Sequence, residues 1–447
     1  MFELTHPALA FVPAKSRLQT VRFWTGILFI LSVYLADTHS VHANSDAPET
    51  KEISLDTDTD IQINVYPASG TQRVIWIPAY ATPADIVPPL AAQANKLNIE
   101  VWHADILEAR FLPKTASSIY SIRENDIIAI INAANEDQGK KLYIFAESRA
   151  AIPVMLALRD LQMSGRYPSN FGGVIMNSPY FYIETPDPGT QAQLMPIASA
   201  TNLPLYIIQP RNSPRYWQLA QSIAALEKSG SDVFVQALPD IRGGFLFRPD
   251  ATPQEEKLAG QFGRMLDRAI RYLNTVNQKA REPEKENVVA IRNAGGKKDR
   301  LLQAYGGNPE PPPLMLNNLS GQPVTLRNFS KRVVLVNFWT TWCPPCVKEM
   351  PSLQRLSDKL AKDRFIILGV NIAEGKETIE NFLTEKINVG FPILLDTDGN
   401  AMRQWNVMAF PTSFVIDKHG KIRHALFGSI DWDTPDITKI IQTLIDE

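Results

Sequence analysis

Short apolar runs and longer stretches with helical spacing alternate along the first part of the chain. The short runs, rich in β-branched and aromatic residues, predict strands at 61–65, 74–78, 99–102, 142–145, 173–176, 205–208 and 233–235. Between and after them, helical patterns lie around 82–96, 118–136, 149–162, 215–229 and 253–278. This rhythm over residues 53–278 predicts an open, mostly parallel α/β sheet with helices on both faces.

A second series of apolar runs fills the last third of the chain. It predicts strands at 333–339, 365–371, 391–395, 413–416 and 422–427, and helices at 351–362, 377–385 and 434–445. We therefore expect a second α/β domain over residues 314–447. The segment 279–313 between the two series is charged, then rich in glycine, then rich in proline, which predicts a partly stiff linker.

Length and charge narrow the class of protein. A chain of 447 residues is too long for one ordinary domain, so at least two are expected. A formal net charge of −2 gives no indication of nucleic-acid binding. The sequence shows neither a metal-ligand cluster nor a glycine-rich phosphate loop, so we expect no metal and no cofactor.

Residues 1–43 are predicted to be a targeting segment. Lys15, Arg17 and Arg22 precede an uncharged apolar run at residues 23–36, which is short for a membrane span and typical of a signal peptide. The small-x-small sequence 41–43 offers a cleavage site, and an uncleaved membrane anchor is the alternative. Either way the rest of the chain is expected in the periplasm or cell envelope.

The chain holds only two cysteines, Cys343 and Cys346, and two prolines separate them. They follow a predicted buried strand and open a predicted helix, where the helix dipole and free N–H groups favour a thiolate. We expect Cys343 to attack a disulfide and Cys346 to resolve the mixed disulfide. A structural disulfide, half a zinc site and ordinary core cysteines are the alternatives; zinc would need two further ligands.

The motifs around this pair carry a family resemblance. Residues 314–447 resemble the TlpA/ResA-like branch of the thioredoxin superfamily, through the motifs at 318–321, 334–342, 343–346, 349–351, 391–396 and 410–412. The resemblance implies a thioredoxin-like fold, a redox-active Cys343–Cys346 disulfide and a cis-proline at Pro411 facing it. It also implies that Glu349 assists proton movement at Cys346, in place of the buried aspartate that generic thioredoxins have where this chain has Asn337. Of Trp339 and Trp342, one is expected to pack in the core and the other, taken to be Trp342, to shield the disulfide.

The same resemblance implies activity and partners. It indicates an exported protein-disulfide oxidoreductase that works as a reductase, with protein thiols and disulfides of the cell envelope as substrates. Apocytochrome c, in cytochrome c maturation, and mis-paired envelope proteins are examples. Electrons would come from a membrane thiol-disulfide carrier.

One turn in the first domain is similar to a different family. Ser148 follows a predicted strand and opens a helix, as in the nucleophile elbow of α/β-hydrolases, although Ala146 stands where that motif has glycine. No histidine follows Ser148 until His419, so the usual triad cannot be assembled. His103, with Asp105 nearby, is the only other candidate base in the domain. We therefore predict a hydrolase-like fold without catalysis, whose carboxyl-edge loops, including Ala79–Tyr80 and Arg149, form a binding pocket or docking face.

Two alternative functions stay open at this point. The chain could be a serine esterase acting through Ser148 with a redox appendage. It could also be a partner-binding module in which the first domain recruits a protein to the thioredoxin-like domain. Labelling of Ser148 by a fluorophosphonate probe, and partner capture by the separated domains, would distinguish these alternatives.

Overall fold

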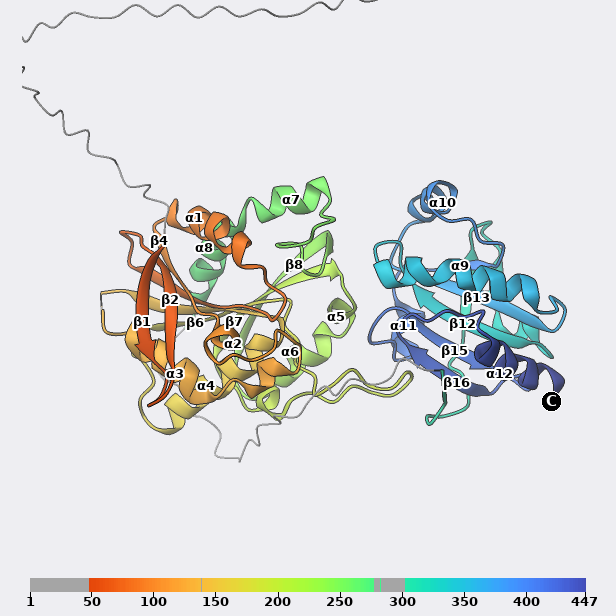
Figure 1. The fold of residues 1–447 in the computed structure, drawn as a ribbon, viewed down its shortest axis with the longest axis horizontal. Helices are drawn as coiled ribbons and strands as arrows, with labels where there is room; N and C mark the ends of the chain where they lie inside the picture. The colour runs from red at the N-terminus through yellow and green to blue at the C-terminus, as the bar shows by residue number, and fades with distance from the viewer. Residues whose placement is uncertain (1–47, 138, 277–281, 283–301) are drawn as a thin grey trace, which may run out of the picture. The chain divides into compact units, whose positions relative to one another are not determined.

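The computed structural model describes residues 48–137, 139–276, 282 and 302–447 (Figure 1). The predicted targeting segment and most of the predicted linker lie outside these residues. Among the helices of the described residues, none combines the length and the apolar character needed to cross a membrane.

The first sheet has eight strands in the order β1-β2-β4-β3-β5-β6-β7-β8. Their bounds are β1 Glu49–Ser54, β2 Asp60–Tyr66, β3 Gln72–Ile77, β4 Ile99–His103, β5 Lys141–Glu147, β6 Phe171–Asn177, β7 Pro204–Asn212 and β8 Asp232–Arg242. β2 runs antiparallel to β1 and β4. The other neighbouring pairs, from β4-β3 and β3-β5 to β7-β8, are all parallel. Every strand predicted here is present. β1 was not predicted, because its mostly exposed, polar residues give no apolar run.

Helices cover both faces of this sheet, as expected for parallel strands whose side chains are buried on both sides (Figure 1). α1 (Val87–Asn95) and α8 (Phe262–Leu273) pack on one face in a core that includes Trp76. α3 (Glu124–Ala134), α4 (Ala151–Met163) and α6 (Leu219–Lys228) pack on the other. The shorter helices are η1 Ala84–Ile86, α2 Ile106–Ala109, η2 Ser118–Ser121, η3 Ser148–Ala150, η4 Pro196–Ser199, α5 Pro214–Trp217 and α7 Pro253–Ala259.

The second sheet also has eight strands, in the order β11-β10-β14-β13-β12-β15-β16-β9. Their bounds are β9 Gln303–Ala304, β10 Met315–Asn318, β11 Pro323–Thr325, β12 Val333–Trp339, β13 Phe365–Ile372, β14 Ile393–Asp396, β15 Thr412–Ile416 and β16 Ile422–Phe427. β12, β13 and β14 are parallel, whereas β15 is antiparallel to β12. The buried strand β12 thus lies at the centre, which positions the cysteine pair that follows it.

Two cores flank this second sheet. α9 (Pro344–Lys359), α10 (Lys376–Glu385) and α12 (Pro435–Asp446) contribute to the core on one face. α11 (Asn400–Gln404) packs on the other face with Val336 and Phe338 of β12, and η5 spans Leu326–Phe329. α11 was missed because a helix of one turn carries too short a pattern to detect.

The linker was predicted to extend to residue 313, but the second sheet begins before that residue. Gln303 and Ala304 of β9 pair with Ala425 and His424 of β16. The amide of Ile422 donates to the carbonyl of Pro309 at 2.8 Å. Residues 303–309 therefore belong to the edge of the second sheet, although their composition predicted an extended connector.

Candidate functional site

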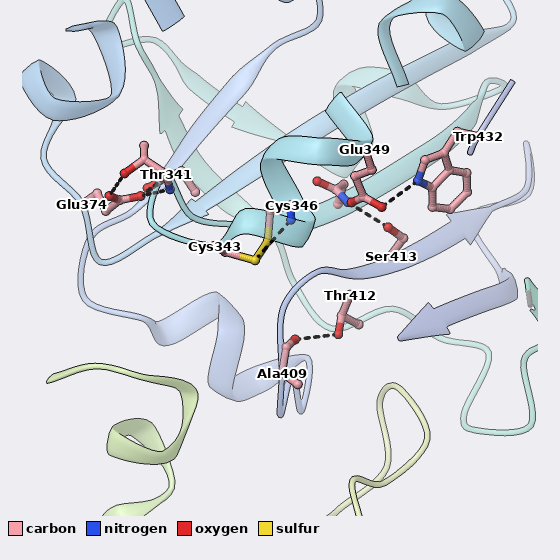
Figure 2. Close-up of a disulfide and its surroundings, with 11 residues drawn as sticks. Thr341, Cys343, Cys346, Glu349, Glu374, Ala409, Thr412, Ser413 and Trp432 are labelled. Atoms are coloured by element: carbon pink, nitrogen blue, oxygen red, sulfur yellow. Dashed lines mark hydrogen bonds between the residues drawn. A yellow bond between two sulfur atoms is a disulfide. The ribbon is translucent and has the colours of Figure 1, made fainter. Parts of the chain in front are cut away.

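The two cysteines lie at the start of helix α9, which follows strand β12. Cys343 is the N-cap residue of α9, Pro344 and Pro345 occupy the first two helical positions, and Cys346 lies in the first turn. The two sulfurs form a disulfide, and the amide of Cys346 donates to Sγ of Cys343 at 3.3 Å (Figure 2). Because proline has no N–H, this amide is the first donor of the helix, and it points at the Cys343 sulfur. The site therefore favours negative charge on Cys343 over Cys346.

A buried carboxyl group lies one turn further along α9. Glu349 is only 1% exposed, and it follows Cys346 by three residues, so the two side chains share a helix face. Its carboxylate accepts from Trp432 Nε1 at 3.1 Å (Figure 2). It also accepts from Asn337 Nδ2 at 2.8 Å. Burial raises the pKa of Glu349 to about 7, against the opposing effect of these two donors. A group with this pKa exchanges a proton near neutral pH.

Asn337, on β12, is hydrogen-bonded to Glu349, on α9. Its side-chain amide is buried at the centre of β12 and donates to both Glu349 and the hydroxyl of Ser413, at 2.8 and 2.9 Å. An aspartate at 337 would place a second carboxylate against Glu349, which like-charge repulsion disfavours. Asn337 and Glu349 therefore form one arrangement with a single titratable group.

Pro411 and Trp342 lie in the segments that border the disulfide. The peptide bond between Phe410 and Pro411 is cis, as the resemblance implied. The Trp342 ring meets the Phe410 ring edge-on at 5.9 Å between centroids, so the loop before Cys343 contacts the loop before β15. Trp339, by contrast, is fully buried and packs against Phe382. Trp339 is therefore the core tryptophan, and shielding of the disulfide by Trp342 stays a prediction.

Sequence reasoning missed Glu374, which holds the loop in front of Cys343. Its carboxylate accepts from the backbone amide of Thr341 at 2.7 Å and from the Thr341 hydroxyl (Figure 2). It also accepts from Asn371 Nδ2 at 2.8 Å. Burial raises the pKa of Glu374. The available signal was the parallel pairing of β12 with β13, which ends at Trp339 and Asn371 and brings the two following loops together.

The predicted second site at Ser148 is not assembled as a triad. Ser148 follows β5 with a φ of 52°, the sharp turn that the elbow motif implied. His103 ends β4, and β3 lies between β4 and β5 in the sheet. The His103 ring packs against Trp76 at 5.7 Å between centroids, and burial lowers its pKa to about 4. No hydrogen bond joins His103 to Ser148 in the described part of the chain, and the resemblance to α/β-hydrolases stays a prediction.

Comparisons with known proteins show which proteins part of this chain resembles. The model of the AhpC/TSA family matches residues 309–425. The chain is 35% identical over 119 residues to "Thiol-disulfide oxidoreductase ResA" of Geobacillus kaustophilus, which covers 27% of this chain and 68% of the relative. It is 30% identical over 121 residues to "Sporulation thiol-disulfide oxidoreductase A" of Bacillus subtilis, covering 26% of this chain and 72% of that protein.

The crystal structure of StoA from Bacillus subtilis is 25% identical, with a TM-score of 0.26, and covers 30% of this chain and 98% of that one. The family match at residues 309–425 falls on the second sheet. Through this region the chain belongs to the TlpA/ResA-like thiol-disulfide oxidoreductases of the AhpC/TSA family.

Proposed function

We propose that the Cys343–Cys346 pair reduces disulfides of other proteins in the cell envelope. The observation that carries this proposal is the buried Glu349, one turn beyond Cys346, with a pKa of about 7. A proton acceptor beside the inner cysteine serves the step in which that cysteine must become a thiolate.

In the first step the reduced pair meets a substrate disulfide. The Cys343 thiolate attacks one substrate sulfur, the substrate S–S bond breaks, and the other substrate sulfur leaves as a thiolate that takes a proton. A mixed disulfide now joins Cys343 to the substrate. The Cys346 amide, 3.3 Å from the Cys343 sulfur, supports the thiolate before the attack.

In the second step Cys346 resolves the mixed disulfide. Its thiol passes a proton to the Glu349 carboxylate, and the thiolate attacks Cys343 Sγ to close the internal disulfide. The second substrate sulfur leaves as a thiolate. Two electrons have then moved from the cysteine pair to the substrate, so the cycle requires a dithiol donor to reduce Cys343–Cys346 again.

The named relatives support the chemistry, and the sequence supports the location. The apolar run at residues 23–36 favours export by a signal peptide or retention by an N-terminal anchor. In that compartment a membrane thiol-disulfide carrier is the expected donor. Apocytochrome c and mis-paired envelope proteins are the expected substrates by resemblance. Pro411 and Trp342 are proposed to shape the surface on which the substrate disulfide docks.

The reduction potential of the pair tests the direction of the reaction. Equilibration of the purified protein with defined thiol buffers is expected to give a value near that of thioredoxin, about −270 mV. A value near −120 mV would identify an oxidant and overturn the proposal. The variant Glu385→Gln removes the charge of an exposed glutamate of α10. It shows whether the loss of a surface charge alone changes the reduction potential, and we expect no change.

A further inference from the structure

Three neighbouring parallel strands of the first sheet bring polar side chains to one place at their carboxyl ends. Ser148 and Arg149 follow β5, Ser178 and Tyr180 follow β6, and Arg215 lies on α5 after β7. The amide of Tyr180 donates to the carbonyl of Ser148 at 3.1 Å, so the first two loops are joined. The carboxyl edge of such a sheet is where α/β proteins bind ligands.

The two arginines share one aromatic ring. The guanidinium carbon of Arg149 lies 3.8 Å from the centroid of the Tyr180 ring, and that of Arg215 lies 5.4 Å from the same centroid. Arg149 Nε donates to the hydroxyl of Tyr120 at 3.1 Å, and Arg215 donates to the carbonyl of Ser178 at 2.7 Å. Both guanidinium groups are thus held in place by neutral partners.

Neither arginine is paired with a carboxylate of the described residues. Within the described residues, no ion pair joins Arg149 or Arg215 to an acidic side chain. Burial and the charge of Arg149 lower the pKa of Arg215 to about 10. Two positive charges held beside each other without a counter-ion oppose folding, so their retention calls for a compensating role.

The nearest acidic candidate is engaged elsewhere. Glu147 ends β5, and its carboxylate accepts from the amide of Ala79 at 3.2 Å and from the hydroxyl of Thr82. Burial raises the pKa of Glu147, which favours its neutral form and makes it a weak counter-ion.

A buried hydroxyl lies at the same edge. Ser178 is 5% exposed, and its Oγ makes no hydrogen bond with any residue that the structure describes. Its φ of 51° is in the left-handed region, which is costly for a residue other than glycine. An unpaired buried donor opposes folding, because it has lost its hydrogen bonds to water without replacing them. Strain and an unused donor beside two uncompensated arginines are features of a binding site.

We propose that Arg149, Arg215 and Ser178 bind a small oxyanion, a carboxylate or phosphate group, at the carboxyl edge of the first sheet. The planar guanidinium groups offer N–H pairs that match two oxygens of such a group, and the Ser178 hydroxyl adds a neutral donor. The Tyr180 ring orients both guanidinium groups from one side. Within the described residues no hydrogen bond joins Ser148 to His103, which favours binding rather than hydrolysis at this site.

The test measures thermal unfolding of the purified full chain in Tris–chloride buffer while inorganic phosphate or acetate is titrated in. Sodium chloride at matched ionic strength is the reference. Saturable stabilisation by either oxyanion is expected, because a ligand that binds only the folded state raises its melting temperature. Comparison of the phosphate and acetate titrations then tells which oxyanion the site prefers.

Variants locate the effect. Arg149→Gln and Arg215→Gln are each expected to weaken binding at least tenfold by isothermal titration calorimetry. Arg149→Lys keeps the charge and loses the planar N–H pair. Its affinity for the oxyanion is expected to lie between that of the two glutamine variants and that of the native chain. Arg211→Gln, at an exposed arginine that stacks on Tyr216, is the matched control and should bind as the native chain does.

The unliganded variants separate a ligand site from a structural one. Removal of one of two uncompensated charges should leave the melting temperature of Arg149→Gln unchanged or raise it in buffer without oxyanion. A fall in melting temperature there would show that Arg149 serves the fold. Stabilisation that is absent, or equal in all variants including Arg211→Gln, would also overturn the proposal.

Discussion

Trp432 donates its indole N–H to the carboxylate of Glu349 at 3.1 Å, although 83 positions separate the two residues along the chain. Trp432 is fully buried just before α12, and Glu349 lies in the first half of α9. The bond therefore ties the C-terminal end of the protein to the acid that lies beside the cysteine pair. It fixes the orientation of the carboxyl group while leaving that group able to titrate.

The raised pKa of Glu349 predicts a dependence of stability on pH. The pKa of Glu349 is about 7 in the folded chain, whereas an unperturbed glutamate has a pKa of 4.5. Between these two pH values the folded state therefore holds a proton that the unfolded state releases. The free energy of unfolding should therefore fall as pH rises from 4.5 to 7. This group alone accounts for about 3 kcal/mol of that fall.

Glu349→Gln should remove this dependence, because the amide stays neutral at every pH. We expect the variant to be more stable than the native chain at pH 8 and to differ little from it at pH 5. Urea unfolding at both pH values is the measurement, with the exposed Glu385→Gln as the control. Equal loss of stability with pH in the native chain and Glu349→Gln would show that Glu349 does not hold the proton.

The roles of the two cysteines predict an asymmetry between their variants. Cys346→Ala leaves the attacking thiol but removes the resolving one, so a mixed disulfide between Cys343 and a substrate protein should accumulate. Cys343→Ala should trap little or nothing. Non-reducing electrophoresis of extracts that contain each variant shows the adducts directly. Trapping through Cys346 in the Cys343→Ala variant would reverse the assignment.

Glu374 predicts a stability effect close to the disulfide but outside the cysteine motif. Glu374→Ala leaves the amide and hydroxyl of Thr341 without their acceptor, which we expect to cost about 1–3 kcal/mol. Denaturant unfolding of the oxidised protein measures this cost. Glu377→Ala, at an exposed glutamate at the start of α10, is the matched control and should change stability by less than about 0.5 kcal/mol.

Ser148 should not behave as a catalytic nucleophile. His103 lies two strands away in the sheet, packs on Trp76, and is kept neutral by burial without contact to Ser148. We therefore expect a fluorophosphonate probe to leave the folded chain unlabelled. Labelling that disappears in Ser148→Ala would instead establish a hydrolase at this edge and would require a base that the sequence does not suggest.

How much of the molecule followed from its sequence depended on how local each signal was. The position of Cys343 before a helix could be predicted, because strand, prolines and helix lie within a few residues of one another. Glu349 was identified through its place in a family motif. Trp432 could not be assigned as its partner, since nothing in a single sequence links two residues so far apart.

The same reasoning explains the errors at the edges of the sheets. β1 pairs through a strand of polar residues, so no apolar pattern marked it. Gln303 and Ala304 are exposed and lie in a segment whose composition is that of a linker, yet their backbone groups pair with β16. Pairing of backbone groups is indifferent to side-chain type at an exposed edge, so composition cannot detect it.

The pairing of β9 with β16 also shields the second sheet from unwanted association. An unpaired edge strand is a template on which another chain can add its own strand. A fragment that begins at residue 309, where the family match starts, would leave the backbone of His424 and Ala425 open. A fragment that begins at residue 302 would keep that edge covered and should stay monomeric at concentrations where the shorter one aggregates.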